Sequence, residues 1–171
     1  VDVKAATQKG VLVVNSPGGN TIAAAEHTIA MMLALSRNIP IANSSTFLGK
    51  WERKKFVGNE LFKKKLGVVG LGKIGTHVAK VANALGMDVY GYDPFVSSER
   101  AQQLQVKLSE LKTLFAESDY VTLHLPRTSE TENLVDMKVL KSMKNNAKLI
   151  NCARGGIIDE EALAEALNNS L

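Results

Sequence analysis

Three glycines in the segment VVGLGKIG have the spacing G-x-G-x-x-G. An apolar run precedes them and a helical pattern follows, which is the context that a dinucleotide-binding loop requires. In such a loop Gly70 permits the tight turn after the strand, Gly72 lets a pyrophosphate approach the backbone, and Gly75 lets the helix pack on the sheet. The amides of Lys73 and Ile74 then face the phosphates, supported by the positive end of the helix dipole.

An acidic residue follows at the distance typical of such a site. Asp93 ends the next predicted strand, 18 residues after Gly75. A carboxylate at this position accepts hydrogen bonds from the adenosine ribose hydroxyls of NAD and repels the 2′-phosphate of NADP. The sequence therefore predicts NAD as the cofactor.

A second candidate site is the segment NCARGGIIDE, which follows a later predicted strand. The planar guanidinium of Arg154 can bind a carboxylate through two hydrogen bonds and place positive charge near a reacting carbonyl. Ligands of a doubly wound sheet lie beyond the carboxyl ends of its strands, so Arg154 should face the same crevice as Gly72. A surface salt bridge is the alternative interpretation of Arg154. Cys152 is interpreted as a small buried hydrophobic residue.

Alternating apolar runs and amphipathic stretches must position these residues. We expect a short buried strand over 11–15 and a helix over 21–37, with Asn20 as its N-cap and apolar residues on both faces. The predicted helical stripe there contains Ile22, Ile29, Met32 and Leu33. From residue 66 the pattern becomes β-α-β, with strands over 66–70, 87–93, 106–108, 120–125 and 147–152 and helices capped by Ser109 and Asp159. This alternation predicts an α/β fold with a doubly wound parallel sheet.

Composition limits the class of protein. The 171 residues suit one domain, and 45% hydrophobic and 22% charged residues suit a folded core. No apolar run approaches the ~20 residues of a membrane span, and one cysteine suits a reducing compartment, so we expect a cytoplasmic protein without a membrane partner. Basic clusters at 53–55 and 63–65 are interpreted as solvated surface rather than a nucleic-acid site. No metal site is predicted.

With these residues the chain resembles the D-isomer-specific 2-hydroxyacid dehydrogenases. The resemblance rests on NSPGGNTIAAAEHTIAMMLALSR, LGVVGLGKIG, GYDP, LHLP and NCARGGIIDE, which are spread over nearly the whole chain. It implies a Rossmann-type NAD-binding domain over 17–171 and a remnant of the substrate domain over 1–16. It also implies that Arg154 binds the 2-oxo acid. The further residues implied at the cofactor are Pro94, His124, Leu125, Pro126, Cys152 and Ala153.

The segment GKWERKKFVGNEL is typical, within that family, of members that oxidise 3-phosphoglycerate to 3-phosphohydroxypyruvate, the first step of the phosphorylated route to serine. The resemblance also implies a homodimer or higher homo-oligomer formed through residues 21–51. Two alternatives stay open. One is another D-2-hydroxy acid as substrate, and the other is a dehydrogenase-like corepressor module that senses NAD(H).

Hydride transfer to or from a 2-hydroxy acid also needs a general acid-base. The three histidines do not suit this role: His27 lies within a helix, His77 follows the glycine loop, and His124 is placed near the adenosine half of the cofactor. By resemblance, the catalytic glutamate and histidine lie farther beyond Arg154 than this chain extends. Because the chain also begins with valine and ends where another strand is expected, we predict a piece of a longer protein that binds NAD without turnover.

Overall fold

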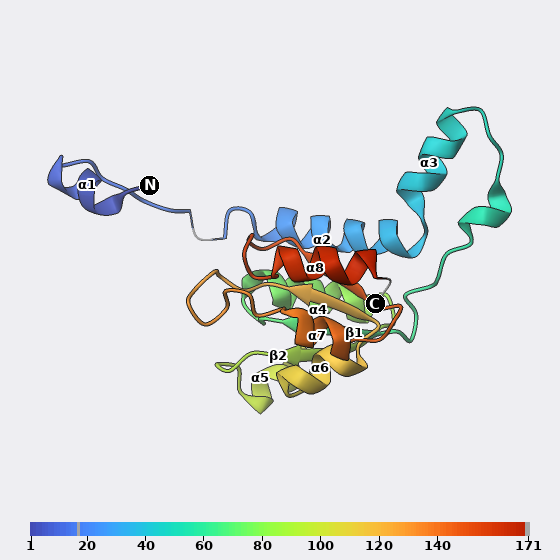
Figure 1. The fold of residues 1–171 in the computed structure, drawn as a ribbon. Helices are drawn as coiled ribbons and strands as arrows, with labels where there is room; N and C mark the ends of the chain where they lie inside the picture. Colours follow the sequence, from blue (N-terminus) through green and yellow to red (C-terminus); the bar gives the residue numbers. More distant parts are fainter. Residues whose placement is uncertain (17, 170–171) are drawn as a thin grey trace.

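The computed structural model describes residues 1–16 and 18–169, and its centre is a parallel sheet with the strand order β3-β2-β1-β4-β5 (Figure 1). The strands are β1 (Lys65–Val69), β2 (Asp88–Tyr92), β3 (Lys107–Leu108), β4 (Tyr120–Leu123) and β5 (Lys148–Asn151). All four pairings in this sheet are parallel, which confirms the predicted α/β fold. The chain builds outward from β1 in one direction and then returns to add β4 on the other side. The loops after β1 and β4 therefore meet at the switch point of the sheet.

Helices cover both faces of the sheet, as a parallel sheet requires. The strands alternate their side chains between two apolar clusters: Leu66 and Val68 join one, and Val69 joins the other. The first cluster contains residues of α2 (Thr21–Ser36) and α4 (Lys73–Ala84), and the second contains residues of α6 (Leu111–Glu117), α7 (Met137–Ser142) and α8 (Glu160–Asn168). α5 (Ser98–Gln103) lies next to the edge strand β3.

Some local details differ from the sequence prediction. Asp159 caps α8 as predicted, accepting a hydrogen bond from the Ala162 amide at 3.0 Å. Ser109 does not cap α6, because Glu110 occupies the N-cap position. Asn20 stands at the N-cap of α2 but makes no capping hydrogen bond. The predicted stripe on α2 is also partly wrong, since Ile22 and Leu33 are exposed; the buried residues are Ala25, Thr28, Met32 and Ser36.

Two segments project from the body at opposite sides of Figure 1. One holds α1 (Val3–Gln8) and the following extended chain, and the other holds α3 (Ile39–Phe47) and the 3₁₀ turn η1 (Arg53–Phe56). The strand predicted over 11–15 is wrong: the segment forms no strand, and Leu12 is 86% exposed. A strand requires a neighbour for its backbone groups, and none of the described residues pairs with this one. In the described part of the chain, no helix has the length and apolar character to cross a membrane.

Candidate functional site

The loop between β1 and α4 has the backbone geometry that the glycine spacing predicts. Gly70 has a φ of +94°, and a Cβ added there would lie 2.6 Å from the carbonyl oxygen of His124. A Cβ on Gly75 would lie 1.9 Å from the carbonyl oxygen of Gly70, so only glycine lets α4 start this close to the loop. A Cβ on Gly72, the N-cap of α4, would meet nothing within 4 Å. This open backbone at the start of a helix fits an approaching pyrophosphate.

The Asp93 carboxylate joins the end of β2 to the glycine loop. Its Oδ2 accepts a hydrogen bond from the Leu71 amide at 2.8 Å, and its Oδ1 accepts one from the Phe95 amide at 2.9 Å. Each carboxylate oxygen has a further lone pair. Asp93 can therefore hold the loop and still accept hydrogen bonds from a ribose. Pro94 follows directly and is exposed.

A groove of about 380 Å³ lies at the carboxyl ends of β4 and β5, beside the starts of α2 and α4. It brings together residues that are far apart in the sequence. Seven of the predicted site residues line it, and they come from the first turn of α4 and from the loops after β4 and β5: Ile74, His124, Leu125, Pro126, Cys152, Ala153 and Arg154. The other predicted site residues lie outside the lining of this groove, in the loop after β1, the first turn of α4 and the loop after β2: Gly70, Gly72, Lys73, Gly75, Asp93 and Pro94.

His124 is held in the groove as a neutral imidazole. Its Nε2 lies 3.0 Å from the hydroxyl of Thr122, which is fully buried. Burial lowers the pKa of His124 to about 4. The ring therefore carries no charge at neutral pH, and the positive charge of the groove comes from Arg127 and Arg154.

Arg154 is exposed at the rim of the groove, and its Nη1 donates a hydrogen bond to the Ala153 carbonyl at 2.7 Å. Among residues 1–16 and 18–169 it pairs with no carboxylate. Within these described residues the structure gives the salt-bridge interpretation no support. A guanidinium with most of its donors free is suited to bind an anionic ligand.

Sequence reasoning missed three groove residues: Asn20, Ala24 and Arg127. The signal for Asn20 was present but was interpreted as a helix cap, and the structure instead leaves its side chain without a capping bond. Arg127 directly follows the LHLP segment and forms an ion pair with Glu132.

The other candidate acid-base groups lie elsewhere. His27 is exposed on α2 and His77 is half-buried on α4, and neither lines the groove. Glu160, Glu161 and Glu165 belong to α8. In the described ranges, no three His, Cys, Asp or Glu side chains gather closely enough to hold a metal ion.

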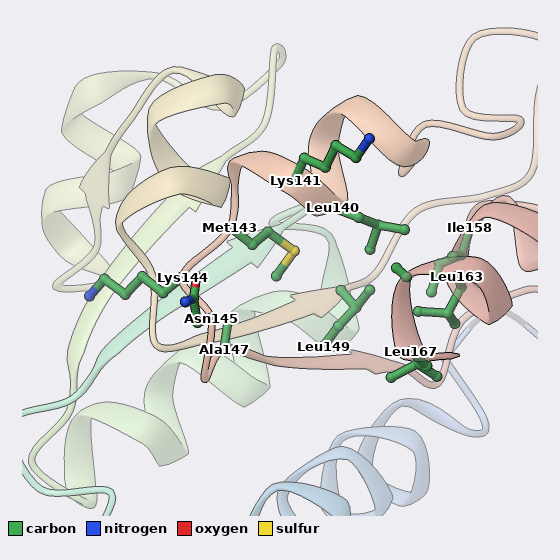
Figure 2. Close-up of a pocket in the computed structure, with 11 residues that line it drawn as sticks. Leu140, Lys141, Met143, Lys144, Asn145, Ala147, Leu149, Ile158, Leu163 and Leu167 are labelled. Atoms are coloured by element: carbon green, nitrogen blue, oxygen red, sulfur yellow. The ribbon is translucent and has the colours of Figure 1, made fainter. Parts of the chain in front are cut away.

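A second cavity, of about 360 Å³, lies between α7, β5 and α8 (Figure 2). Its lining is mostly aliphatic, with Leu140, Leu149 and Leu163 pointing into it and Lys141 at the edge. It contains none of the predicted site residues. We place the candidate site in the groove, because a reaction needs several convergent polar groups. The groove has two guanidinium groups, an imidazole and a side-chain amide, whereas the lining of the cavity is mostly aliphatic.

Comparison with known proteins agrees with this geometry. The family profile described as "D-isomer specific 2-hydroxyacid dehydrogenase, NAD binding domain" matches residues 29–171. The chain is 59% identical over 170 residues to a D-3-phosphoglycerate dehydrogenase of Synechocystis sp.. It is 56% identical over 167 residues to a D-3-phosphoglycerate dehydrogenase of Archaeoglobus fulgidus.

The chain belongs to the D-isomer-specific 2-hydroxyacid dehydrogenase family. Residues 29–171 match the NAD-binding domain of that family, so the cofactor of this domain is NAD. The match to the Synechocystis protein covers 99% of this chain and 31% of that protein, and the match to the Archaeoglobus protein covers 98% of this chain and 32% of that protein. The chain therefore spans about a third of the length of these relatives.

Solved structures of D-lactate dehydrogenases share the fold. The apo-structure of D-lactate dehydrogenase from Escherichia coli superposes with a TM-score of 0.93 at 37% identity, covering 99% of this chain and 54% of that one. D-lactate dehydrogenase from Aquifex aeolicus, complexed with NAD and lactic acid, gives a TM-score of 0.86 at 33% identity, with 99% and 51% coverage. The predicted Rossmann-type domain is thus confirmed.

Proposed function

We propose that this chain is the cofactor-binding part of a longer enzyme that transfers hydride between NAD and 3-phosphoglycerate. The support is the 59% and 56% identity to two proteins named D-3-phosphoglycerate dehydrogenase. In this proposal residues 17–171 form the NAD-binding domain and residues 1–16 belong to the substrate domain. The absence of buried residues from α1 supports the second boundary, because a segment of another domain has no core to join here.

The cofactor lies along the carboxyl edge of the sheet in this proposal. The backbone at Gly70, Gly72 and Gly75, with the amides of Lys73 and Ile74, holds the pyrophosphate, and Asp93 accepts hydrogen bonds from the adenosine ribose with Pro94 beside it. NAD supplies the hydride acceptor when it is bound. The groove receives the rest of the cofactor, with Cys152, Ala153 and Arg154 at the nicotinamide. His124, Leu125 and Pro126 line the same groove and flank the cofactor.

Arg154 binds the carboxylate of the 2-hydroxy or 2-oxo acid and adds positive charge beside the reacting carbonyl. The single observation that carries this assignment is its position in the groove without any carboxylate partner among the described residues. His124 is neutral and Arg127 is paired with Glu132, so Arg154 is the guanidinium of the groove that has no carboxylate partner among the described residues. A substrate carboxylate is thus directed to the guanidinium.

Proton transfer depends on residues outside this chain. His124 is the histidine that lines the groove within the described ranges, and its low pKa makes it a weak base. Loss of a general acid-base typically costs ~10²–10⁴-fold in rate. We therefore propose that the 171-residue chain binds NAD without measurable turnover. The whole enzyme would act in the cytoplasm, in the first step of serine synthesis.

Titration of the chain with NADH by calorimetry tests the cofactor site. We expect saturable binding, weaker than that of an intact enzyme. The full-length enzyme, assayed with 3-phosphohydroxypyruvate and NADH, tests the reaction. Arg154→Ala there should raise KM or abolish turnover while NADH affinity stays close to that of the parent. Lys144→Ala is the control, because Lys144 precedes β5 at the amino ends of the strands and does not line the groove. A folded chain that binds no NADH would overturn the proposal.

We further propose a homodimer, or a higher homo-oligomer, formed through residues 21–51. α2 is buried on one face, yet Ile22 and Leu35 are exposed on it, so it is apolar on both sides as predicted. The exposed apolar surface continues beyond α2, with Phe47 at 89% and Trp51 at 84% exposure. Apolar surface of this kind is typical of an interface between subunits.

A further inference from the structure

The side chain of Asn151 makes two hydrogen bonds to the backbone of the loop that carries Arg154. The amide nitrogen of Asn151 donates a hydrogen bond to the Arg154 carbonyl at 2.9 Å. The amide oxygen of the same Asn151 accepts a hydrogen bond from the Ala153 backbone at 3.1 Å. Asn151 is the last residue of β5, so its two bonds fix the turn directly to the sheet.

The segment 126–135 holds this loop from the other side. The Asn133 amide donates to the Gly156 carbonyl at 2.8 Å, and the Val135 amide donates to the Ile157 carbonyl at 3.1 Å. Val135 and Ile157 are fully buried. The far end of the Arg154 loop is therefore anchored in the second apolar cluster of the domain.

The guanidinium of Arg127 lies against Gly156 of the loop. Gly156 has a φ of +77°, and a Cβ added there would lie 2.9 Å from the guanidinium carbon of Arg127. The guanidinium thus packs against the Gly156 backbone, and its ion pair with Glu132 keeps it there. Gly155 and Gly156 would otherwise give the loop wide backbone freedom.

We propose that Asn151 and Arg127 are positioning residues that set the direction in which Arg154 presents its guanidinium. This inference rests on the proposed role of Arg154 in binding the substrate carboxylate. Arg154 is itself exposed and has no carboxylate partner in the described ranges, so the backbone beneath it determines where the side chain points. Asn151 orients that backbone through its two hydrogen bonds, and Arg127 restrains the glycines that follow.

The test compares kinetic constants of the full-length enzyme with 3-phosphohydroxypyruvate and NADH. Asn151→Ala removes both hydrogen bonds of the Asn151 side chain to the loop. The loss of one hydrogen bond of this kind corresponds to about a tenfold change in affinity. We expect KM for the 2-oxo acid to rise at least about tenfold while NADH affinity changes less than about threefold. Arg127→Met should raise KM in the same direction, and Arg127→Lys, which keeps a cation for Glu132, should restore part of the loss.

Asn83→Ala is the matched control for the asparagine. Its side-chain amide also donates to two backbone carbonyls, those of Leu104 and Gln105, both at 3.2 Å, but it lies on α4 away from the groove. We expect it to lower stability without changing KM for the 2-oxo acid. If Asn151→Ala does not fold, the comparison of Arg127→Met with Arg127→Lys decides the question, because Arg127 is exposed.

The outcomes separate the two proposals. If the unchanged enzyme reduces no 2-oxo acid, the proposed function fails and this inference fails with it. If the unchanged enzyme is active and the Asn151 and Arg127 variants keep its KM, only the inference is overturned. An equal loss of NADH affinity and substrate affinity would also overturn it, because the loop would then be a general structural support.

Discussion

Acidification from pH 6.5 towards pH 4 should destabilise this domain through His124. The ring is half-buried beside Thr122, and burial lowers the pKa of His124 from 6.5 to about 4. In the unfolded chain the imidazole is in water, so its pKa returns to about 6.5. Between these two values the unfolded state binds a proton that the folded state does not. The free energy of unfolding therefore rises with pH across this window and falls as the pH drops from 6.5 towards 4.

The magnitude follows from the two pKa values. At about 1.36 kcal/mol per pH unit, a pKa that falls from 6.5 to about 4 limits the effect to about 3.4 kcal/mol. At pH 5 most of the unfolded chain is protonated at this ring and most of the folded chain is not, so about 2 kcal/mol should be lost relative to pH 8. A loss of this size is a large part of the stability of a small domain, which is typically ~5–15 kcal/mol.

Urea unfolding of the 171-residue chain at pH 5 and pH 8 measures this loss, and His124→Gln is the comparison. Glutamine can still form a hydrogen bond with Thr122 but does not titrate. The pKa values of Glu52 and Asp119 are also shifted downward. A hydrogen bond from Lys55 lowers the pKa of Glu52; burial raises the pKa of Asp119, but hydrogen bonds from Lys144 and from the Lys65 amide together outweigh it. Those carboxylates are present in both proteins, and their contribution to stability is lost only at lower pH, so they cancel in the difference.

We expect the parent to lose about 2 kcal/mol more than His124→Gln between pH 8 and pH 5. If both proteins show the same pH dependence, His124 is not buried as a neutral ring in solution. The account of the groove as a site whose positive charge comes from its arginines would then be wrong.

Three further predictions concern the cofactor loop and the exposed apolar surface. Asp93→Ala should weaken NADH binding by about 1–3 kcal/mol and reduce the preference for NADH over NADPH, because a charge-assisted acceptor is lost. If parallel titrations give the same ratio of NADH affinity to NADPH affinity for variant and parent, Asp93 does not contact the ribose. Gly75→Ala should destabilise the domain by about 1–3 kcal/mol, since its Cβ would lie 1.9 Å from the Gly70 carbonyl oxygen. Gly72→Ala should melt at the same temperature as the parent in thermal unfolding but bind NADH more weakly. A destabilised Gly72→Ala beside an unaffected Gly75→Ala would contradict the loop geometry. Light scattering of the full-length enzyme should show a dimer or larger oligomer that Trp51→Ser weakens, and a monomer at micromolar concentration would refute the interface.

Much of the fold and of the cofactor loop could be predicted from the sequence. The alternation of strands and helices from residue 66 onward follows from local apolar periodicity, which depends on near neighbours in the chain. The roles of Gly70, Gly72 and Gly75 follow from the same local logic, because each is a steric requirement of one turn and one helix start. Asp93 follows from the length of a β-α-β unit, which places its carboxylate next to that turn.

Only the tertiary structure decided the rest. The strand predicted over 11–15 required a pairing partner, and a pairing partner is a property of other segments. Thr122 and His124 form a buried pair because packing removes water from them, and no local pattern states how deeply a ring lies. Asn20 and Arg127 enter the groove because three chain segments, far apart in sequence, end at one edge of the sheet. Sequence spacing sets what each loop can do, and the order of the strands determines which loops act together.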